Sequence, residues 1–291
     1  MKINSSFLKP TIIIGAARSG TRMLRTVIAS SSDFVCIPYD INYIWKYGNF
    51  HKNHDELISC DLNKNIKNYI HRQFFKIIKN QKNKKIVEKT VSNCLRVDFI
   101  KSIFPECKII HIIRDGRDIA ESSRRCWEAP LDISYIVRKA LNFPIKDAHK
   151  YAFRYLKNNL NRFFNNKNKI KSWGPRFKGI DEIVKRYSLI EVCGLQWLRC
   201  VESTLKSLKK LNRDEYIQIR YEDIVSNPIS ELRKIADFLE IQDFDSMERF
   251  AMREITDTNI GKWKINLSNE EKKLLIHHIR KMLVKLNYLE K

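Results

Sequence analysis

Residues 11–30, TIIIGAARSGTRMLRTVIAS, constrain the fold of this chain more than any other stretch. The β-branched run 11–14 is too short for a helix and is typical of a strand buried on both faces of a parallel sheet. After Gly20, apolar side chains recur at helical spacing. A strand, a glycine-bounded loop and a helix in this order predict a phosphate cradle, because the N–H groups of the loop and the positive end of the helix converge.

The spacing of Gly15 and Gly20 is that of a P-loop, but Thr21 and Arg22 stand where a nucleotide-hydrolysing enzyme has lysine followed by serine or threonine. In such enzymes the lysine reaches the transferred phosphate and the hydroxyl holds magnesium. The loop therefore indicates phosphate binding without indicating ATP. The alternative is an ordinary turn between a strand and a helix with two incidental arginines.

Length and composition favour one globular α/β domain covering residues 1–291. The hydrophobic fraction is 43%, and no repeat or disordered linker interrupts the 291 residues. The formal net charge of +22 predicts attraction to polyanions, acidic cofactors or an anionic membrane surface, although solvated basic faces without a partner would give the same charge.

The cysteines argue against disulfides and zinc. Seven cysteines include no Cys-x-x-Cys pair, so reduced thiols and a cytoplasmic location are expected. The first residues lack the apolar core of a signal peptide, and no run approaches the roughly 18 consecutive apolar residues of a membrane-spanning helix.

His111 lies within an apolar run and is interpreted as a core residue.

Four further short apolar runs predict strands at residues 34–38, 85–88, 107–113 and 216–219. Helical patterns separate them, so the chain is predicted to form a parallel central sheet flanked by helices. The loosely patterned, aromatic and basic stretch 128–180 is predicted to be a helical insertion over the binding edge of the sheet. A capping box formed by Ser268 and Glu271 predicts the start of the last helix.

Polar side chains follow several of these strands. Asp40 comes after the second strand, Lys89 follows residues 85–88, and Arg114 follows residues 107–113. Ser122 lies eight residues after Arg114, about two helical turns, so both side chains can address one phosphate. Two anion sites on one sheet suit a ligand with phosphates at both ends, whereas the alternative for residues 114–118 is a surface salt-bridge cluster.

These motifs together resemble the sulfotransferase family, which uses 3′-phosphoadenosine 5′-phosphosulfate (PAPS). The resemblance rests on GAARSGTRML at 15–24, VEKTVSN at 87–93 and IIRDGRDIAES at 112–122, with further similar segments at 220–228 and 261–264. It implies a P-loop-like α/β fold, PAPS as the sulfuryl donor and adenosine 3′,5′-bisphosphate as the product. It implies no metal and no nucleic acid, and an acceptor that is a saccharide or lipid-linked glycan.

The resemblance also implies residue roles. The loop would bind the 5′-phosphosulfate, Arg114 and Ser122 the 3′-phosphate, and Tyr221 would approach the adenine. Lys89 corresponds to the catalytic lysine of the family. The residues of the loop, and those that would close over the nucleotide, are Ala17, Arg18, Ser19, Gly20, Thr21 and Arg22, and Gly261, Lys262 and Trp263, respectively.

A carboxylate is needed to take the proton of the attacking acceptor. Heparan sulfate sulfotransferases place a glutamate at a position that corresponds to Asp40, a shorter carboxylate, and Glu88 is the competing candidate. Val91 stands where many relatives have proline. A sulfuryl group carries less charge than a phosphoryl group in the transition state, so arginine, lysine and helix N–H groups can stabilise it without magnesium.

Two other functions compete with sulfuryl transfer. A nucleotide kinase or NTPase would use the same loop, but Thr21 and Arg22 replace the pair that coordinates magnesium. A basic nucleic-acid-binding protein would explain the charge of +22 and would leave the motifs at the strand ends without a role.

Overall fold

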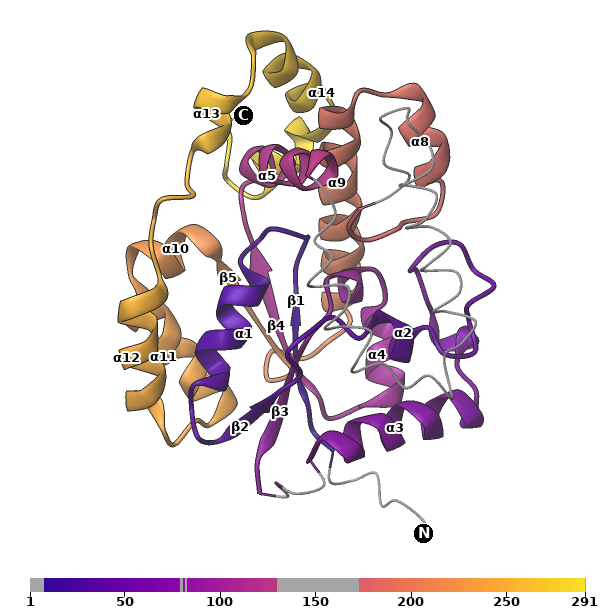
Figure 1. The fold of residues 1–291 in the computed structure, drawn as a ribbon, viewed down its shortest axis with the longest axis vertical. Coiled ribbons are helices and arrows are strands. Elements are labelled where there is room, and N and C mark those ends of the chain that lie inside the picture. The colour runs from indigo at the N-terminus through magenta and orange to yellow at the C-terminus, as the bar shows by residue number, and fades with distance from the viewer. Residues whose placement is uncertain (1–7, 79–80, 82, 130–172, 291) are drawn as a thin grey trace.

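The computed structural model describes residues 8–78, 81, 83–129 and 173–290, and its centre is a parallel five-stranded sheet (Figure 1). The strand order is β2-β3-β1-β4-β5, so the first strand lies in the middle. The strands are β1 (Thr11–Ile14), β2 (Phe34–Cys36), β3 (Lys85–Lys89), β4 (Lys108–Ile113) and β5 (Tyr216–Arg220).

The central strand shows why such a short apolar run forms a strand. All four residues of β1 are buried, and Ile13 pairs with Lys89 of β3 and with Ile110 of β4. Ile12 and Ile14 belong to the core on one face of the sheet, and Ile13 belongs to the core on the other. A strand covered on both faces needs apolar side chains at consecutive positions, which is the pattern of this run.

Helices cover both faces of the sheet (Figure 1). One core includes side chains of α2 (Asn42–Trp45), α3 (Lys64–Ile78) and α4 (Val97–Ile103), with the 3₁₀ helix η2 (Ser59–Asp61) beside α4. The opposite core includes side chains of α1 (Thr21–Ala29), α10 (Tyr221–Ser226), α11 (Pro228–Leu239) and α12 (Phe244–Glu254).

A third group of helices gathers at the carboxyl ends of the strands, and its longest member, Leu189–Leu208, runs back from there beside the sheet (Figure 1). They pack around the buried Trp127 and Trp197, and a Cβ on Gly116 would lie only 2.6 Å from the Trp197 ring. This packing sets the first turn of α5 against α9. The group comprises η3 (Val91–Leu95), α5 (Gly116–Glu128), α8 (Ile180–Arg186), α9 (Leu189–Leu208), α13 (Lys262–Asn266) and α14 (Asn269–Lys285).

The sequence-based predictions of the α/β class, the five strands and the capping box are confirmed. His111 is buried, lies 3.2 Å from Gln218 Oε1, and burial lowers its pKa to about 4, as suits a core histidine. All seven cysteines are free. The short helix α13 begins within segment 261–264, for which the sequence predicts no helix. Most of the predicted insertion, residues 130–172, lies outside the described residues.

Candidate active site

The loop of residues 15–20 joins β1 to α1 and is shaped by close contacts. A Cβ on Gly15 would lie 2.6 Å from Ser19 Oγ and 2.7 Å from the carbonyl oxygen of Ile112, so only glycine fits. Gly20 has φ of 89°, in the left-handed region. The Ser19 hydroxyl donates to the carbonyl of Ala16 at 2.6 Å and turns the loop back on itself.

The helix that follows this loop begins without a side-chain cap. Its first N–H groups therefore remain available to an anion, which the positive end of the helix also attracts. Thr21 is buried at this end, whereas Arg18 and Arg22 are exposed. The loop thus combines free backbone N–H groups at the start of α1 with two long cationic side chains. These are the hydrogen-bond donors that a phosphate or phosphosulfate needs.

Residues far apart in the sequence meet beside this loop. Arg18 Nε donates to Ser122 Oγ at 2.9 Å, and Arg114 Nη1 donates to the carbonyl of Arg18 at 2.8 Å. The Arg114 side chain is buried, and its Nε has no hydrogen-bond partner among the described residues. A buried, unpaired guanidinium N–H costs free energy unless a ligand accepts from it. The two predicted anion-binding motifs therefore share one location.

Tyr221 packs against both Arg114 and the loop. Its ring is buried, and the Arg114 guanidinium lies over it at 4.3 Å from the centroid. A Cβ on Gly20 would lie 2.5 Å from Tyr221 Cδ2, so the ring also contacts the loop. The Tyr221 ring thus contacts both the loop and Arg114.

The segment that includes Gly261, Lys262 and Trp263 reaches the same place. Its neighbour Asn259 accepts a hydrogen bond from Arg114 Nη2 through its carbonyl, and Lys262 Nζ donates to Asn259 Oδ1 at 2.9 Å. The N–H groups of Gly261 and Trp263 donate to the carboxylate of Asp118 at 2.8 and 3.1 Å.

Asp118 therefore caps α13 and engages the backbone N–H groups of two of the three residues that were expected to close over the nucleotide. Burial raises the pKa of Asp118, while these two backbone hydrogen bonds act in the opposite direction. No local pattern in the sequence predicts this role, although Asp118 lies within the RDGRD motif at residues 114–118. In this segment, the Lys262 side chain remains the group best suited to contact an anion.

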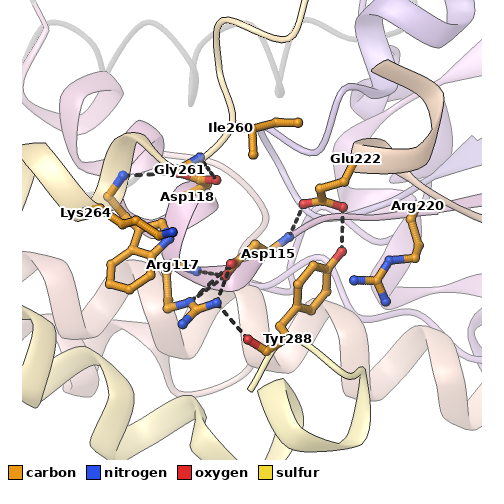
Figure 2. A pocket seen from close by; sticks show the side chains of 10 residues that line it. Asp115, Arg117, Asp118, Arg220, Glu222, Ile260, Gly261, Lys264 and Tyr288 are labelled. Carbon is orange, nitrogen blue, oxygen red and sulfur yellow. Dashed lines mark hydrogen bonds and ion pairs between the residues drawn. The ribbon is translucent and has the colours of Figure 1, made fainter. Parts of the chain in front are cut away.

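A pocket of about 200 Å³ lies next to this segment, where the chain end meets the start of α5 (Figure 2). Several of its charged groups already have partners: Arg117 bonds to Asp115 at 2.7 Å and to the carbonyl of Tyr288 at 2.8 Å. The Tyr288 hydroxyl donates to Glu222 at 2.7 Å, and Arg220 stacks on the Tyr288 ring. The lining contains as many carboxylates as cations. This pocket is therefore a poor phosphate site, and its contacts fasten the chain end to the strand ends.

Asp40 and Lys89 meet at the ends of β2 and β3. Lys89 Nζ lies 2.7 Å from Asp40 Oδ1, and the N–H of Val91 lies 3.4 Å from Asp40 Oδ2. Cys36 of β2 pairs in parallel with Val87 of β3. This pairing brings Asp40, which follows β2, and Lys89, the last residue of β3, to the same edge of the sheet. Oδ2 is the less tightly bound oxygen of this carboxylate and has the greater freedom to accept a proton from a ligand.

Glu88 precedes Lys89 in β3 and is fully buried. It accepts hydrogen bonds from the Thr90 hydroxyl at 2.5 Å and from Asn93 Nδ2 at 2.7 Å. Burial, together with the charge of Asp40, raises the pKa of Glu88 to about 7. Both of its oxygens are already engaged, which leaves Asp40 as the carboxylate with better access to a ligand.

Replacing Glu88 with glutamine is expected to change how stability depends on pH. The pKa of Glu88 is about 7 in the fold against 4.5 normally, so the folded protein keeps a proton that the unfolded chain releases between these values. As pH rises from 4.5 to 7, the unfolding free energy of the wild-type protein should fall relative to that of the variant by about 3 kcal/mol. Urea unfolding at a series of pH values measures this difference.

The control for this experiment is Glu106→Gln, at a position whose side chain is 58% exposed. It should show no comparable change with pH. A constant difference between Glu88→Gln and the wild-type protein across this range would contradict the raised pKa.

The described part of the chain contains no group of three or more histidine, cysteine, aspartate or glutamate side chains arranged to hold a metal ion. None of its helices is long and apolar enough to cross a membrane.

Comparison with known proteins gives one consistent family. A family model described as "Sulfotransferase family" matches residues 10–171 and 177–246. The fold is similar to that of the sulfotransferase domain from the curacin biosynthetic pathway, with a TM-score of 0.56 and 16% identity over 94% of this chain and 98% of that one. No curated protein matched the sequence.

Two further solved structures share the fold. Sulfotransferase STF9 from Mycobacterium avium has a TM-score of 0.51 and 11% identity, covering 96% of this chain and 77% of that one. The sulfotransferase domain of the Synechococcus PCC 7002 olefin synthase has a TM-score of 0.50 and 14% identity, covering 93% and 95%.

Proposed function

Since the chain belongs to the sulfotransferase family, we propose that it transfers the sulfuryl group of PAPS to a hydroxyl or amine group of an acceptor. The meeting of the loop 15–20 with Arg114 and Ser122 carries this proposal. PAPS has an anionic group at each end, and here two sets of anion-binding residues lie side by side. The unpaired Nε of the buried Arg114 fits a phosphate that would accept from it.

The site residues can be assigned to the two ends of the donor. The amides at the start of α1, with Arg18, Thr21 and Arg22, would bind the phosphosulfate. Arg114 and Ser122 would bind the 3′-phosphate, with Lys262 closing over it. Tyr221 would hold the guanidinium of Arg114 in place, and its adenine contact remains a prediction from family resemblance.

In the reaction, the acceptor oxygen or nitrogen forms a bond to sulfur while the bond between sulfur and the bridging oxygen of the 5′-phosphate breaks. The acceptor proton passes to Asp40, and adenosine 3′,5′-bisphosphate leaves. Lys89 and Arg18 oppose the negative charge that develops on the bridging oxygen. The geometry supports Asp40 over Glu88 as the base, because Glu88 is fully buried and accepts two hydrogen bonds.

The acceptor is proposed to be a saccharide or a lipid-linked glycan, as the resemblance of the sequence motifs to the sulfotransferase family implies. An oligosaccharide series, a lipid-linked glycan and a simple aryl alcohol, each incubated with PAPS radiolabelled in its sulfuryl group, test this proposal. Label in a glycan acceptor supports it, whereas transfer to the aryl alcohol alone would overturn the acceptor class.

Calorimetry separates this function from its alternatives. Binding of adenosine 3′,5′-bisphosphate without magnesium supports sulfuryl transfer. Tight magnesium-dependent binding of ATP with none of the bisphosphate would instead favour a kinase or NTPase. Binding of duplex DNA alone would favour the nucleic-acid alternative that the net charge of +22 suggests.

A further inference from the structure

Asp55 is a buried carboxylate that joins three segments of the chain. It lies between α2 and η2, is 4% exposed, and was not singled out by the sequence. Its Oδ1 accepts from Asn42 Nδ2 at 3.0 Å, and its Oδ2 accepts from the Ser92 hydroxyl at 2.7 Å. Oδ2 also accepts from the N–H of Arg176 at 2.9 Å, while the N–H of Asp55 donates to the Arg176 carbonyl at 2.6 Å.

Two of these segments carry the proposed catalytic pair. Asn42 begins α2, two residues after Asp40, and Ser92 lies in η3, three residues after Lys89. One carboxylate therefore ties the chain that follows Asp40 to the chain that follows Lys89. The Ile41 N–H, which donates to Thr90 Oγ1 at 2.9 Å, makes a second tie between the same two segments.

Arg96 completes the connection from the side of Asn42. Its Nη2 donates to Asn42 Oδ1 at 2.6 Å, and its Nε donates to Asn93 Oδ1 at 3.0 Å. Burial acts to raise the pKa of Asp55, but the charges of Arg96 and Lys46 and the hydrogen bonds from Arg176 and Asn42 outweigh it and hold the pKa below its ordinary value. Asp55 is therefore an ionised acceptor, and hydrogen bonds to an ionised acceptor are the strong ones.

Stability alone is a weak reason for this arrangement. Burying a carboxylate and a guanidinium costs desolvation free energy, and apolar side chains of similar volume stabilise a core as well or better. A buried ionic network does, however, fix the relative position of the segments it joins, because each hydrogen bond demands a direction. The two segments joined here directly follow Asp40 and Lys89, which form an ion pair with each other.

We propose that Asp55 is a positioning residue that fixes Asp40 relative to Lys89. For its effect on turnover the proposal rests on the proposed function, since Asp40 and Lys89 act only if sulfuryl transfer is the reaction. Its geometric part concerns the ion pair itself and can be measured without any substrate.

The substrate-free test is a double-mutant cycle on the ion pair. Asp40→Asn and Lys89→Met, singly and together, give the coupling between the two side chains in urea unfolding. We expect a coupling of at least threefold in the unfolding equilibrium constant in the wild-type and Asp61→Asn backgrounds, and none in the Asp55→Asn background. Asp61 is a matched control because it lies close to Asp55 in the sequence, in η2, and its carboxylate bonds to Lys52 and to the N–H of Ile58 instead. If Asp55→Asn does not fold, Ser92→Ala takes its place.

The second test is turnover of PAPS, with the best acceptor found or with water. Asp55→Asn should lower kcat at least tenfold and leave the Kd for adenosine 3′,5′-bisphosphate within threefold, whereas Asp61→Asn should change neither. A coupling that persists in Asp55→Asn, or a kcat equal to that of Asp61→Asn, overturns the proposal. If the wild-type protein neither turns over PAPS nor binds the bisphosphate, the proposed function fails. The double-mutant cycle alone then tests whether Asp55 fixes Asp40 relative to Lys89.

Discussion

Replacing Arg114 with alanine is expected to weaken binding of adenosine 3′,5′-bisphosphate by roughly 30- to 1000-fold, or about 2 to 4 kcal/mol. Arg114 is buried, and a phosphate bound beside it would be left without its charged partner. The same substitution removes the hydrogen bonds to the carbonyls of Arg18 and Asn259, so the loop and the segment before α13 would lose their common support. Isothermal calorimetry with the bisphosphate measures the change in Kd.

Arg117→Ala provides the matched control for this experiment. Arg117 lies three residues further along the chain, but it is paired with Asp115 and stacks under Trp263 in the pocket of Figure 2. Its removal should change the Kd less than threefold. Arg114→Lys keeps the charge without the planar fork and should give an intermediate loss. Equal losses for Arg114→Ala and Arg117→Ala would contradict a direct role of Arg114 in binding phosphate.

The sheet could be predicted from the sequence because each strand is a short apolar run between polar residues. The clearest case is β4, whose isoleucine-rich run Lys108–Ile113 ends directly before Arg114. The short helix α13 could not be predicted this way. Its first turn depends on Asp118, which lies 143 positions before Gly261, and no local pattern reports a cap supplied from so far away.

The residues that form the site could be predicted from the sequence, but the contacts between their side chains could not. Arg18 and Ser122 were assigned to opposite ends of the nucleotide, yet their side chains bond to each other. The contact between Asp40 and Lys89 depends on the parallel register of β2 with β3, which the order of the strands along the chain does not give. Asp55 was overlooked because it lies in a loop, where no periodicity separates a buried carboxylate from a solvated one.

Asp40→Asn is expected to lower turnover of PAPS by about 10²- to 10⁴-fold, the usual contribution of a general base. Asparagine preserves the size of the side chain and can still accept a hydrogen bond from Lys89, so the site should keep its shape. It cannot take up the acceptor proton. The Kd for adenosine 3′,5′-bisphosphate should therefore stay within about threefold, since Asp40 would act on the acceptor and not on the nucleotide. Steady-state kinetics and calorimetry on the same preparation test both statements.

Two further variants decide between the candidate bases. Asp40→Glu restores a carboxylate and should recover part of the turnover, because a longer side chain can still bring an oxygen to the acceptor. Glu88→Gln should retain far more activity than Asp40→Asn, because the oxygens of Glu88 already accept from Thr90 and Asn93 in a fully buried position. Full activity in Asp40→Asn together with its loss in Glu88→Gln would transfer the role of base to Glu88, and Asp40 would then serve only to orient Lys89.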